Sequence, residues 1–134
     1  MLKTDAEIRQ VLQSAKTIAI VGASPKADRP SNVVAGYLKA QGYTVIPVNP
    51  TADEIVGEKC YASLKEVPVP IDIVDVFRKP EDAPGVAEEA VAVKAKALWL
   101  QLEVISPEAV AIAERAGLQT VMDRCTEIEH MRLF

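Results

Sequence analysis

Residues 18–29, Ile-Ala-Ile-Val-Gly-Ala-Ser-Pro-Lys-Ala-Asp-Arg, decide the fold of this chain. The apolar run Ile18–Val21 is typical of a buried strand, and Gly22-Ala23-Ser24 is typical of a tight turn. Ser31 follows the loop and can cap a helix. A helix start presents free N–H groups and the positive end of the helix dipole, so a strand, a tight turn and a helix form an anion cradle. We therefore expect a phosphate-bearing ligand at this loop.

Segments with strand and helix patterns alternate along the chain. Thr4 and Glu7 have the spacing of a capping box ahead of apolar residues at helical spacing. Residues 49–70 are rich in turn signals, with at most a short helix near 63–66. The patterns predict strands over 17–21, 43–48, 71–77, 97–102 and 118–122. They predict helices over 5–15, from Ser31 to before Gly42, from Pro80 to about Lys94, from Ser106 to before Gly117, and over about 126–131.

This alternation predicts βαβ units with a parallel sheet. Right-handed crossovers then cover both faces of the sheet with helices, which suits the almost wholly apolar runs 18–21, 71–76 and 97–100. We expect an α/β fold, namely a doubly wound three-layer sandwich with a five-stranded parallel sheet. The 134 residues fit a single domain, with a helix over 4–15 and a Rossmann-like core over 17–134.

Composition excludes several classes of partner. The net charge is −4 and no basic run exceeds two residues, so we expect no nucleic-acid binding. No apolar stretch is long enough to span a bilayer and the N-terminus lacks the apolar core of a signal peptide, so we expect no membrane partner and a cytoplasmic location. Cys60 and Cys125 match no metal-ligand spacing and are expected to be small buried hydrophobes.

The ends of the predicted strands point to the site, because ligands of doubly wound sheets bind beyond the carboxyl ends of the strands. This rule selects loops over 22–29, 48–51, 77–80, 101–103 and 124–125. Although the chain is acidic, these loops hold four basic side chains, namely Lys26, Arg29, Arg78 and Lys79.

Two common nucleotide-binding motifs are missing. A dinucleotide fingerprint needs Gly-x-Gly-x-x-Gly after the first strand and an acid after the second. Here the first loop has one glycine, and Val48-Asn49-Pro50 follows the second strand without a carboxylate. No Gly-Lys-Ser/Thr triplet of a phosphate-binding Walker loop occurs. An NAD(P)-type sensing domain is therefore kept only as an alternative hypothesis.

Six stretches, in order and at family-like spacing from about Thr17 to Leu133, resemble the small stand-alone CoA-binding proteins. They are more distantly similar to the nucleotide-binding domain of the succinyl-CoA synthetase alpha subunit. The stretches are Val21–Ser24 (VGAS), Gly42–Pro50 (GYTVIPVNP), Gly57–Tyr61 (GEKCY), Asp72–Arg78 (DIVDVFR), Ala97–Gln101 (ALWLQ) and Met122–Cys125 (MDRC).

The resemblance implies a coenzyme A site on a Rossmann-like sheet, with residues from four loops. Gly22, Ala23 and Ser24 would form the phosphate loop, with Lys26 and Arg29 facing the phosphates. Val48, Asn49 and Pro50 would flank the adenosine half, Phe77 and Arg78 would line the nucleotide, and Gln101 would lie near the pantetheine arm. Lys79 adds a further positive charge beside Arg78.

Three hypotheses follow. The first is a non-catalytic protein that binds CoA or an acyl-CoA as a carrier, sensor or subunit, because no acid/base pair or nucleophile set accompanies the cradle. The second is an enzyme acting on an acyl-CoA or related thioester, alone or with a partner chain, in which changes of Cys125 or Gln101 would lower turnover. Independently of this hypothesis, Cys125 at the site edge could form a mixed disulfide with the CoA thiol. The third is the NAD(P)-type domain. A partner protein or a homo-oligomer is compatible with all three.

Several residues receive structural interpretations. The synthetase uses a phosphohistidine from a second domain, whereas the histidine of this chain, His130, is expected at the surface or a subunit contact. Trp99 is expected in the core. Asp72 and Asp75 are three residues apart in a strand, so they should face opposite sides and not act as an acid/base pair.

Overall fold

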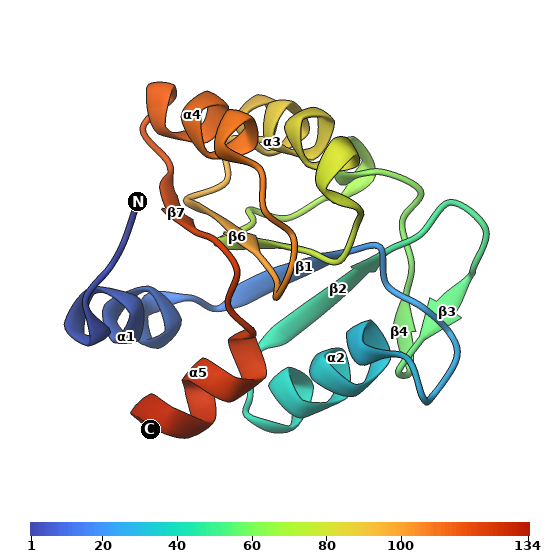
Figure 1. Ribbon diagram of the computed structural model, residues 1–134. Helices are drawn as coiled ribbons and strands as arrows, with labels where there is room; N and C mark the ends of the chain where they lie inside the picture. Colours follow the sequence, from blue (N-terminus) through green and yellow to red (C-terminus); the bar gives the residue numbers. More distant parts are fainter.

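A five-stranded parallel sheet forms the centre of the computed structural model, which describes residues 1–134 (Figure 1). The strands occur in the order β2-β1-β5-β6-β7, and every neighbouring pair is parallel. The α/β fold class expected from the sequence is confirmed. The strands are β1 (Thr17–Val21), β2 (Thr44–Val48), β5 (Ile73–Val76), β6 (Ala97–Leu100) and β7 (Gln119–Val121).

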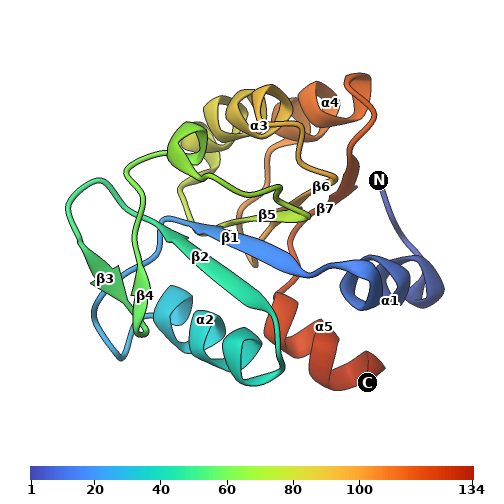
Figure 2. The ribbon, with the colours of Figure 1, turned by 180° about the vertical axis from the view of Figure 1, so that it is seen from behind.

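Helices cover both faces of this sheet, as Figures 1 and 2 show. One core cluster packs α3 and α4 against one face, and a second packs α1, α2 and the start of α5 against the other. None of these helices is long and apolar enough to cross a membrane. The helices are α1 (Asp5–Ser14), α2 (Pro30–Ala40), α3 (Ala83–Ala92), α4 (Pro107–Arg115) and α5 (Thr126–Leu133).

The start of α2 differs from the sequence expectation. The N-cap is Arg29 and Pro30 occupies the first helical turn, where its fixed φ and missing N–H suit the helix. Ser31 therefore lies inside the helix and does not cap it. Its hydroxyl oxygen instead accepts a hydrogen bond from the backbone N–H of Ser24, at 3.0 Å.

A small antiparallel hairpin, β3 (Glu54–Ile55) with β4 (Glu58–Lys59), lies in the region that the sequence predicts only as turns. Val56 and Gly57 connect its strands with φ angles of 49° and 76°, the left-handed conformation favoured in two-residue hairpins. Val-Gly is not one of the usual pairs for such a turn, and two-residue strands carry no periodicity. The predicted short helix is confirmed as the 3₁₀ helix η1 (Leu64–Glu66), and a second one, η2 (Pro80–Asp82), precedes α3.

The aromatic and sulfur residues show one correction. Trp99 is fully buried, and Cys60 and Cys125 are buried with free thiols, as predicted. His130, expected at the surface or a subunit contact, is half-buried and not fully exposed: it shares a 2.8 Å hydrogen bond with the Tyr37 hydroxyl, and its ring stacks on Phe134 with centroids 4.6 Å apart. Burial lowers the pKa of His130.

The order of the strands creates a switch point in the sheet. β1 lies between β2 and β5, so the chain reverses its direction of travel across the sheet at β1. The loops after β1 and β5 consequently leave toward opposite faces. Ligands of open α/β sheets bind at such a switch point.

A buried carboxylate fastens α5 to the rest of the fold. Glu129 accepts hydrogen bonds from Arg124, at 2.7 Å, and from Arg132, at 3.0 Å. Arg132 also reaches Asp5 at the start of α1, at 2.8 Å. The hydrogen bonds from Arg132, first, and from Arg124 lower the pKa of the Glu129 carboxyl, although burial opposes this shift.

We predict that Glu129→Gln lowers the free energy of unfolding by about 1–3 kcal/mol at neutral pH, because charge-assisted hydrogen bonds are lost. Since the pKa of Glu129 is lower in the folded chain, its stabilisation is complete above the ordinary glutamate pKa. The stabilisation disappears as the pH falls through the folded pKa. Denaturant unfolding at a series of pH values measures both effects.

Glu88→Gln is the matched control, because Glu88 is exposed on α3 and forms no ion pair. Its effect should stay within about 0.5 kcal/mol. Equal stability of Glu129→Gln and the natural chain at neutral pH would contradict the prediction.

Candidate functional site

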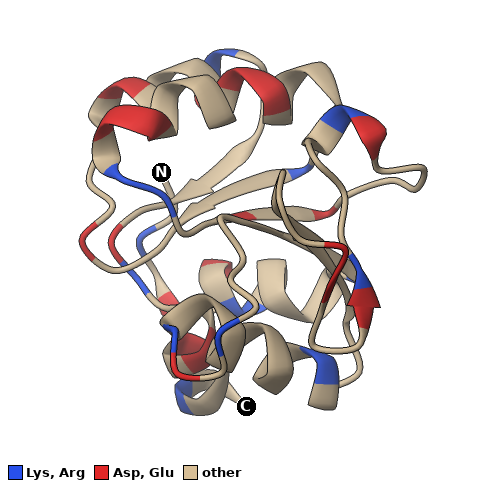
Figure 3. Cartoon of the chain, turned by 90° about the vertical axis from the view of Figure 1, so that its right-hand side faces the viewer, with Lys and Arg blue, Asp and Glu red and all other residues tan.

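Two clefts meet at Gly22, at the carboxyl ends of the strands, the end that faces the reader in Figure 3. Cleft A has a volume of about 360 Å³ and cleft B one of about 420 Å³. Cleft A is bounded by the loop after β1 and the loop after β6, and includes Gly22, Ser24, Lys26, Arg29, Phe77 and Gln101. Cleft B lies between the ends of β1 and β2 and the start of α3, and includes Gly22, Val48, Pro50 and Arg78.

Gly22 is fixed by a close approach of two backbones. Its φ angle is +87°, and a Cβ atom added there would lie 2.4 Å from the carbonyl oxygen of Phe77. No side chain fits at that distance. The N–H of Phe77 also donates to the carbonyl of Val21, at 2.8 Å, so the loops after β1 and β5 are held together where the clefts meet.

Hydrogen bonds to neighbouring elements hold the loop after β1. Besides the Ser24–Ser31 bond, the amide nitrogen of Asn32 donates to the carbonyl of Ser24, at 2.9 Å. The amide nitrogen of Asn49 donates to the carbonyl of Ala23, at 2.8 Å. The loop conformation is therefore set by α2 and by the segment after β2.

The walls of cleft A at the start of α2 suit an anion. No side chain caps this helix, and its first turn contains no acidic residue, so its positive dipole end is uncompensated. The N–H group of Ser31, which lines the cleft, donates to no acceptor of the chain. The exposed side chains of Lys26 and Arg29 form no ion pair. This end of cleft A therefore brings together two unpaired cations and a free backbone donor.

Cleft B has a different chemistry. Val48, Pro50 and Gly85 present apolar or small surfaces, which suit a flat ring. Arg78 pairs with Asp82, four residues further along the chain, at 3.4 Å, and both side chains are more than a third exposed. An exposed pair of this kind contributes little stability, so Arg78 is free to exchange its partner for a ligand.

A buried acid lies beneath cleft A. Asp75 is fully buried in β5, and its carboxylate accepts hydrogen bonds from Gln101 Nε2 and Thr126 Oγ1, both at 2.8 Å. Desolvation raises the pKa of Asp75 to about 7, although the two hydrogen bonds oppose the rise. Asp72 instead accepts backbone N–H bonds from Lys16 and Thr17, so the two aspartates have separate surroundings, as the sequence predicts.

Nine of the twelve residues expected at the site line the clefts, and three do not. Ala23 is buried in the core. The Asn49 side chain donates to the carbonyl of Ala23 and accepts from the N–H of Thr51. Lys79 is exposed outside both clefts, before η2. The residues that sequence reasoning missed are Asp75 and Thr126 below cleft A, and Ser31, Leu102 and Val104 in its wall. A carboxylate in an otherwise apolar strand was the available signal for Asp75.

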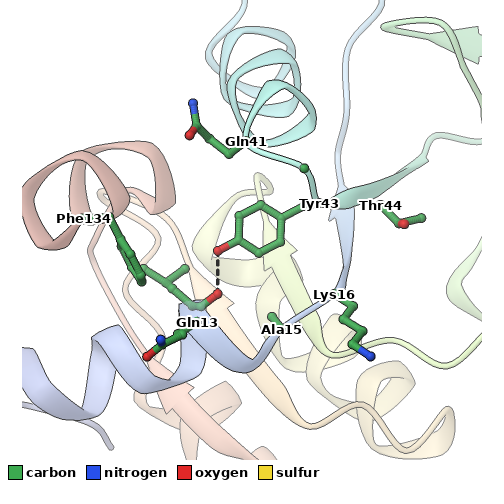
Figure 4. A pocket seen from close by; sticks show the side chains of 9 residues that line it. Gln13, Ala15, Lys16, Gln41, Tyr43, Thr44 and Phe134 are labelled. Carbon is green, nitrogen blue, oxygen red and sulfur yellow. Dashed lines mark hydrogen bonds between the residues drawn. The ribbon is translucent and has the colours of Figure 1, made fainter.

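A third hollow lies at the opposite end of the sheet, between the end of α1 and the start of β2 (Figure 4). The Tyr43 hydroxyl donates to the carbonyl of Leu12 across it, and Phe134 forms one side. Lys16 points away from the Tyr43 ring in Figure 4. No cluster of cations or free backbone donors converges there, so we place the candidate site at clefts A and B.

Comparison with known proteins shows the family of this chain. A family model described as a CoA binding domain matches residues 16–131. The chain belongs to this CoA-binding family. The match covers all five strands of the sheet and both clefts.

Three similar proteins match most of this chain. The chain is 45% identical over 125 residues to the uncharacterized protein YneT of Bacillus subtilis, and the match covers 93% of each chain. A solved structure of a protein from Pyrococcus horikoshii has 44% identity and a TM-score of 0.95, covering 98% of this chain and 92% of that one. The chain is also 30% identical over 120 residues to acetate–CoA ligase (ADP-forming) I of Archaeoglobus fulgidus, but it spans only 18% of that protein.

We predict that Gly22→Ala lowers the free energy of unfolding by at least about 2 kcal/mol. The left-handed conformation costs an L-residue about 1–2 kcal/mol, and the contact with Phe77 adds to it. Gly36→Ala is the matched control, because nothing lies within 4 Å of a Cβ at that position in α2. The control should gain about 0.5–1 kcal/mol of helix stability. Denaturant unfolding compares the two, and equal stabilities would contradict the account of Gly22.

Proposed function

We propose that the protein binds coenzyme A or an acyl-CoA across clefts A and B, as a non-catalytic carrier, sensor or subunit. The observation that carries this proposal is the pairing of Lys26 and Arg29 with an uncapped helix start, directly beside a cleft that includes the apolar surfaces of Val48 and Pro50. A ligand that joins phosphates to an aromatic base suits both.

The residues fit the parts of coenzyme A. The pyrophosphate would be held by the backbone around Gly22 and by Ser24, Lys26 and Arg29, since glycine admits phosphate close to the backbone and arginine grips it in a fork. Cleft B would take the adenosine, between Pro50 and Arg78. The pantetheine arm would then leave along cleft A.

The remainder of cleft A suits such an arm. Phe77, Leu102 and Val104 offer apolar surface, and Gln101 adds a polar group at its floor. A pantetheine arm alternates apolar methylene groups with amides. This mixed wall therefore matches it better than it matches a second nucleotide.

The second hypothesis from the sequence, a thioester enzyme, finds less support. The Cys125 thiol is buried, and burial raises its pKa, so little of it is thiolate at neutral pH. His130 is held by Tyr37 and Phe134 outside the clefts. The ligase relative is named for acetate and CoA, but this chain matches only a part of it.

The dinucleotide hypothesis is also weaker. A dinucleotide site needs a carboxylate after the second strand to hold ribose hydroxyls. Asn49 occupies that position, and its amide nitrogen and oxygen are bonded to Ala23 and Thr51. The acids that line cleft B, Asp82 and Glu89, belong to η2 and α3 and not to the segment after β2.

We predict that Arg29→Ala weakens CoA binding about ten- to a hundredfold, because a charged hydrogen bond to phosphate is worth about 1.5–3 kcal/mol. Lys26→Ala should have a smaller effect, since an ammonium group does not grip phosphate in a fork. Isothermal titration calorimetry with CoA measures both.

Arg115→Ala is the control, because Arg115 is exposed at the end of α4, outside both clefts. Its affinity for CoA should equal that of the natural chain. No heat from the natural chain at millimolar CoA, or saturable NAD(H) binding that CoA fails to displace, would overturn the proposed function.

A further inference from the structure

Three side chains at the floor of cleft A form a closed set of hydrogen bonds. Gln101 Nε2 donates to Asp75 Oδ1 at 2.8 Å and to Thr126 Oγ1 at 2.9 Å. The Thr126 hydroxyl donates to Asp75 Oδ2 at 2.8 Å. Each side chain comes from a different element, β5, the end of β6 and the start of α5, and all three are buried.

The set uses every donor it contains. Both hydrogens of the Gln101 amide nitrogen are taken, and so is the Thr126 hydroxyl hydrogen. A reversed amide would turn Oε1 toward the Asp75 carboxylate, an acceptor against an acceptor. An ionised Asp75 therefore permits one direction of the Gln101 amide.

The opposite end of that amide faces the ligand cleft. Gln101 lines cleft A, and its Oε1 accepts no bond from the chain. The buried side-chain polar atom without a partner is Thr120 Oγ1, so Gln101 Oε1 is not sealed inside the protein. It must therefore reach the cleft as a free acceptor.

We propose that Asp75 and Thr126 are positioning residues that lock the Gln101 amide, so that cleft A presents a carbonyl acceptor and selects ligands that carry an amide N–H beside their phosphates. This inference rests on the proposed function and adds which hydrogen-bonding group cleft A offers to the ligand, namely an acceptor. Coenzyme A has such amides in its pantetheine arm. Adenosine 3′,5′-bisphosphate keeps the adenosine with its 3′- and 5′-phosphates but lacks the second phosphate of the pyrophosphate and the arm, so substitutions in the lock should not change its affinity.

No cation balances Asp75. Ile20 and Trp99 flank it in the sheet, and the titratable group that faces it from α5 is the Cys125 thiol. That thiol has a pKa raised further above neutrality, by burial first and by the Asp75 charge as well. Asp75 is thus the group of this set that changes charge near neutral pH. Its protonation supplies a donor, which makes the reversed Gln101 amide acceptable and releases the lock.

The first experiment compares the affinities for CoA and for adenosine 3′,5′-bisphosphate by calorimetry. Asp75→Asn and Gln101→Met should each weaken CoA about fivefold and leave the bisphosphate unchanged, since one neutral hydrogen bond is lost. Their double variant should lose no more than either single variant, because they act through one contact. In the natural chain the ratio of the two affinities should fall as the pH drops from about 8 to about 6. Asp75→Asn should abolish that trend.

Two substitutions of Thr126 distinguish the lock from a purely structural effect. Thr126→Val keeps the shape and removes the hydroxyl, so it should lower the ratio of the affinity for CoA to the affinity for the bisphosphate. Thr126→Ser keeps the hydroxyl and should leave this ratio as it is in the natural chain. In the ligand-free protein, the side-chain amide NMR signals of Gln101 should shift in Thr126→Val, and in the natural chain they should titrate with Asp75.

The outcomes separate this inference from the proposed function. If Asp75→Asn weakens both ligands equally, weakens neither, or leaves the pH trend in place, the lock is wrong while CoA binding stands. The lock would also be wrong if the side-chain amide signals of Gln101 shifted neither in Thr126→Val nor with pH. If the natural chain binds neither ligand, the proposed function fails and this inference fails with it.

Discussion

The fold and the candidate site both depend on the close approach of two backbones at Gly22. The strand order reverses at β1, so the chain must leave β1 and β5 in opposite directions from adjacent points. The carbonyl of Phe77 fills the space that a side chain at residue 22 would need. Because no side chain blocks this point, clefts A and B open on its two sides and one extended ligand can cross from one to the other.

The charges at this edge are divided between solvent and interior. Lys26 and Arg29 are exposed without acidic partners, although the whole chain carries a net charge of −4. Salt screens exposed charges within about 8–10 Å, so a bound anion responds to these loops more than to the net charge. Asp75 lies behind them, where neutral donors from Gln101 and Thr126 replace water. Such a buried polar network costs stability unless every member is satisfied, and here the one unsatisfied acceptor reaches the cleft.

The elements that the sequence predicts well are those with local signals. Apolar runs marked all five strands, and glycine, proline or asparagine borders four of them, because burial on both faces of a parallel sheet needs continuous apolar residues. The β3–β4 hairpin was not predicted, since two-residue strands show no periodic pattern. Ser31 was misjudged as a cap, because Pro30 starts the helix before it and frees its hydroxyl to hold Ser24.

Local sequence patterns predict the α/β fold class, the segments that end at the carboxyl edge of the sheet, and the cations within them. Each of these depends on a few neighbouring residues. The tertiary structure alone decided that the edge divides into two clefts, that His130 is enclosed by aromatic rings, and that Gln101 joins Asp75 and Thr126. These residues meet across 26 and 51 positions of the chain, where strand order and register set the contacts and local propensity carries no information.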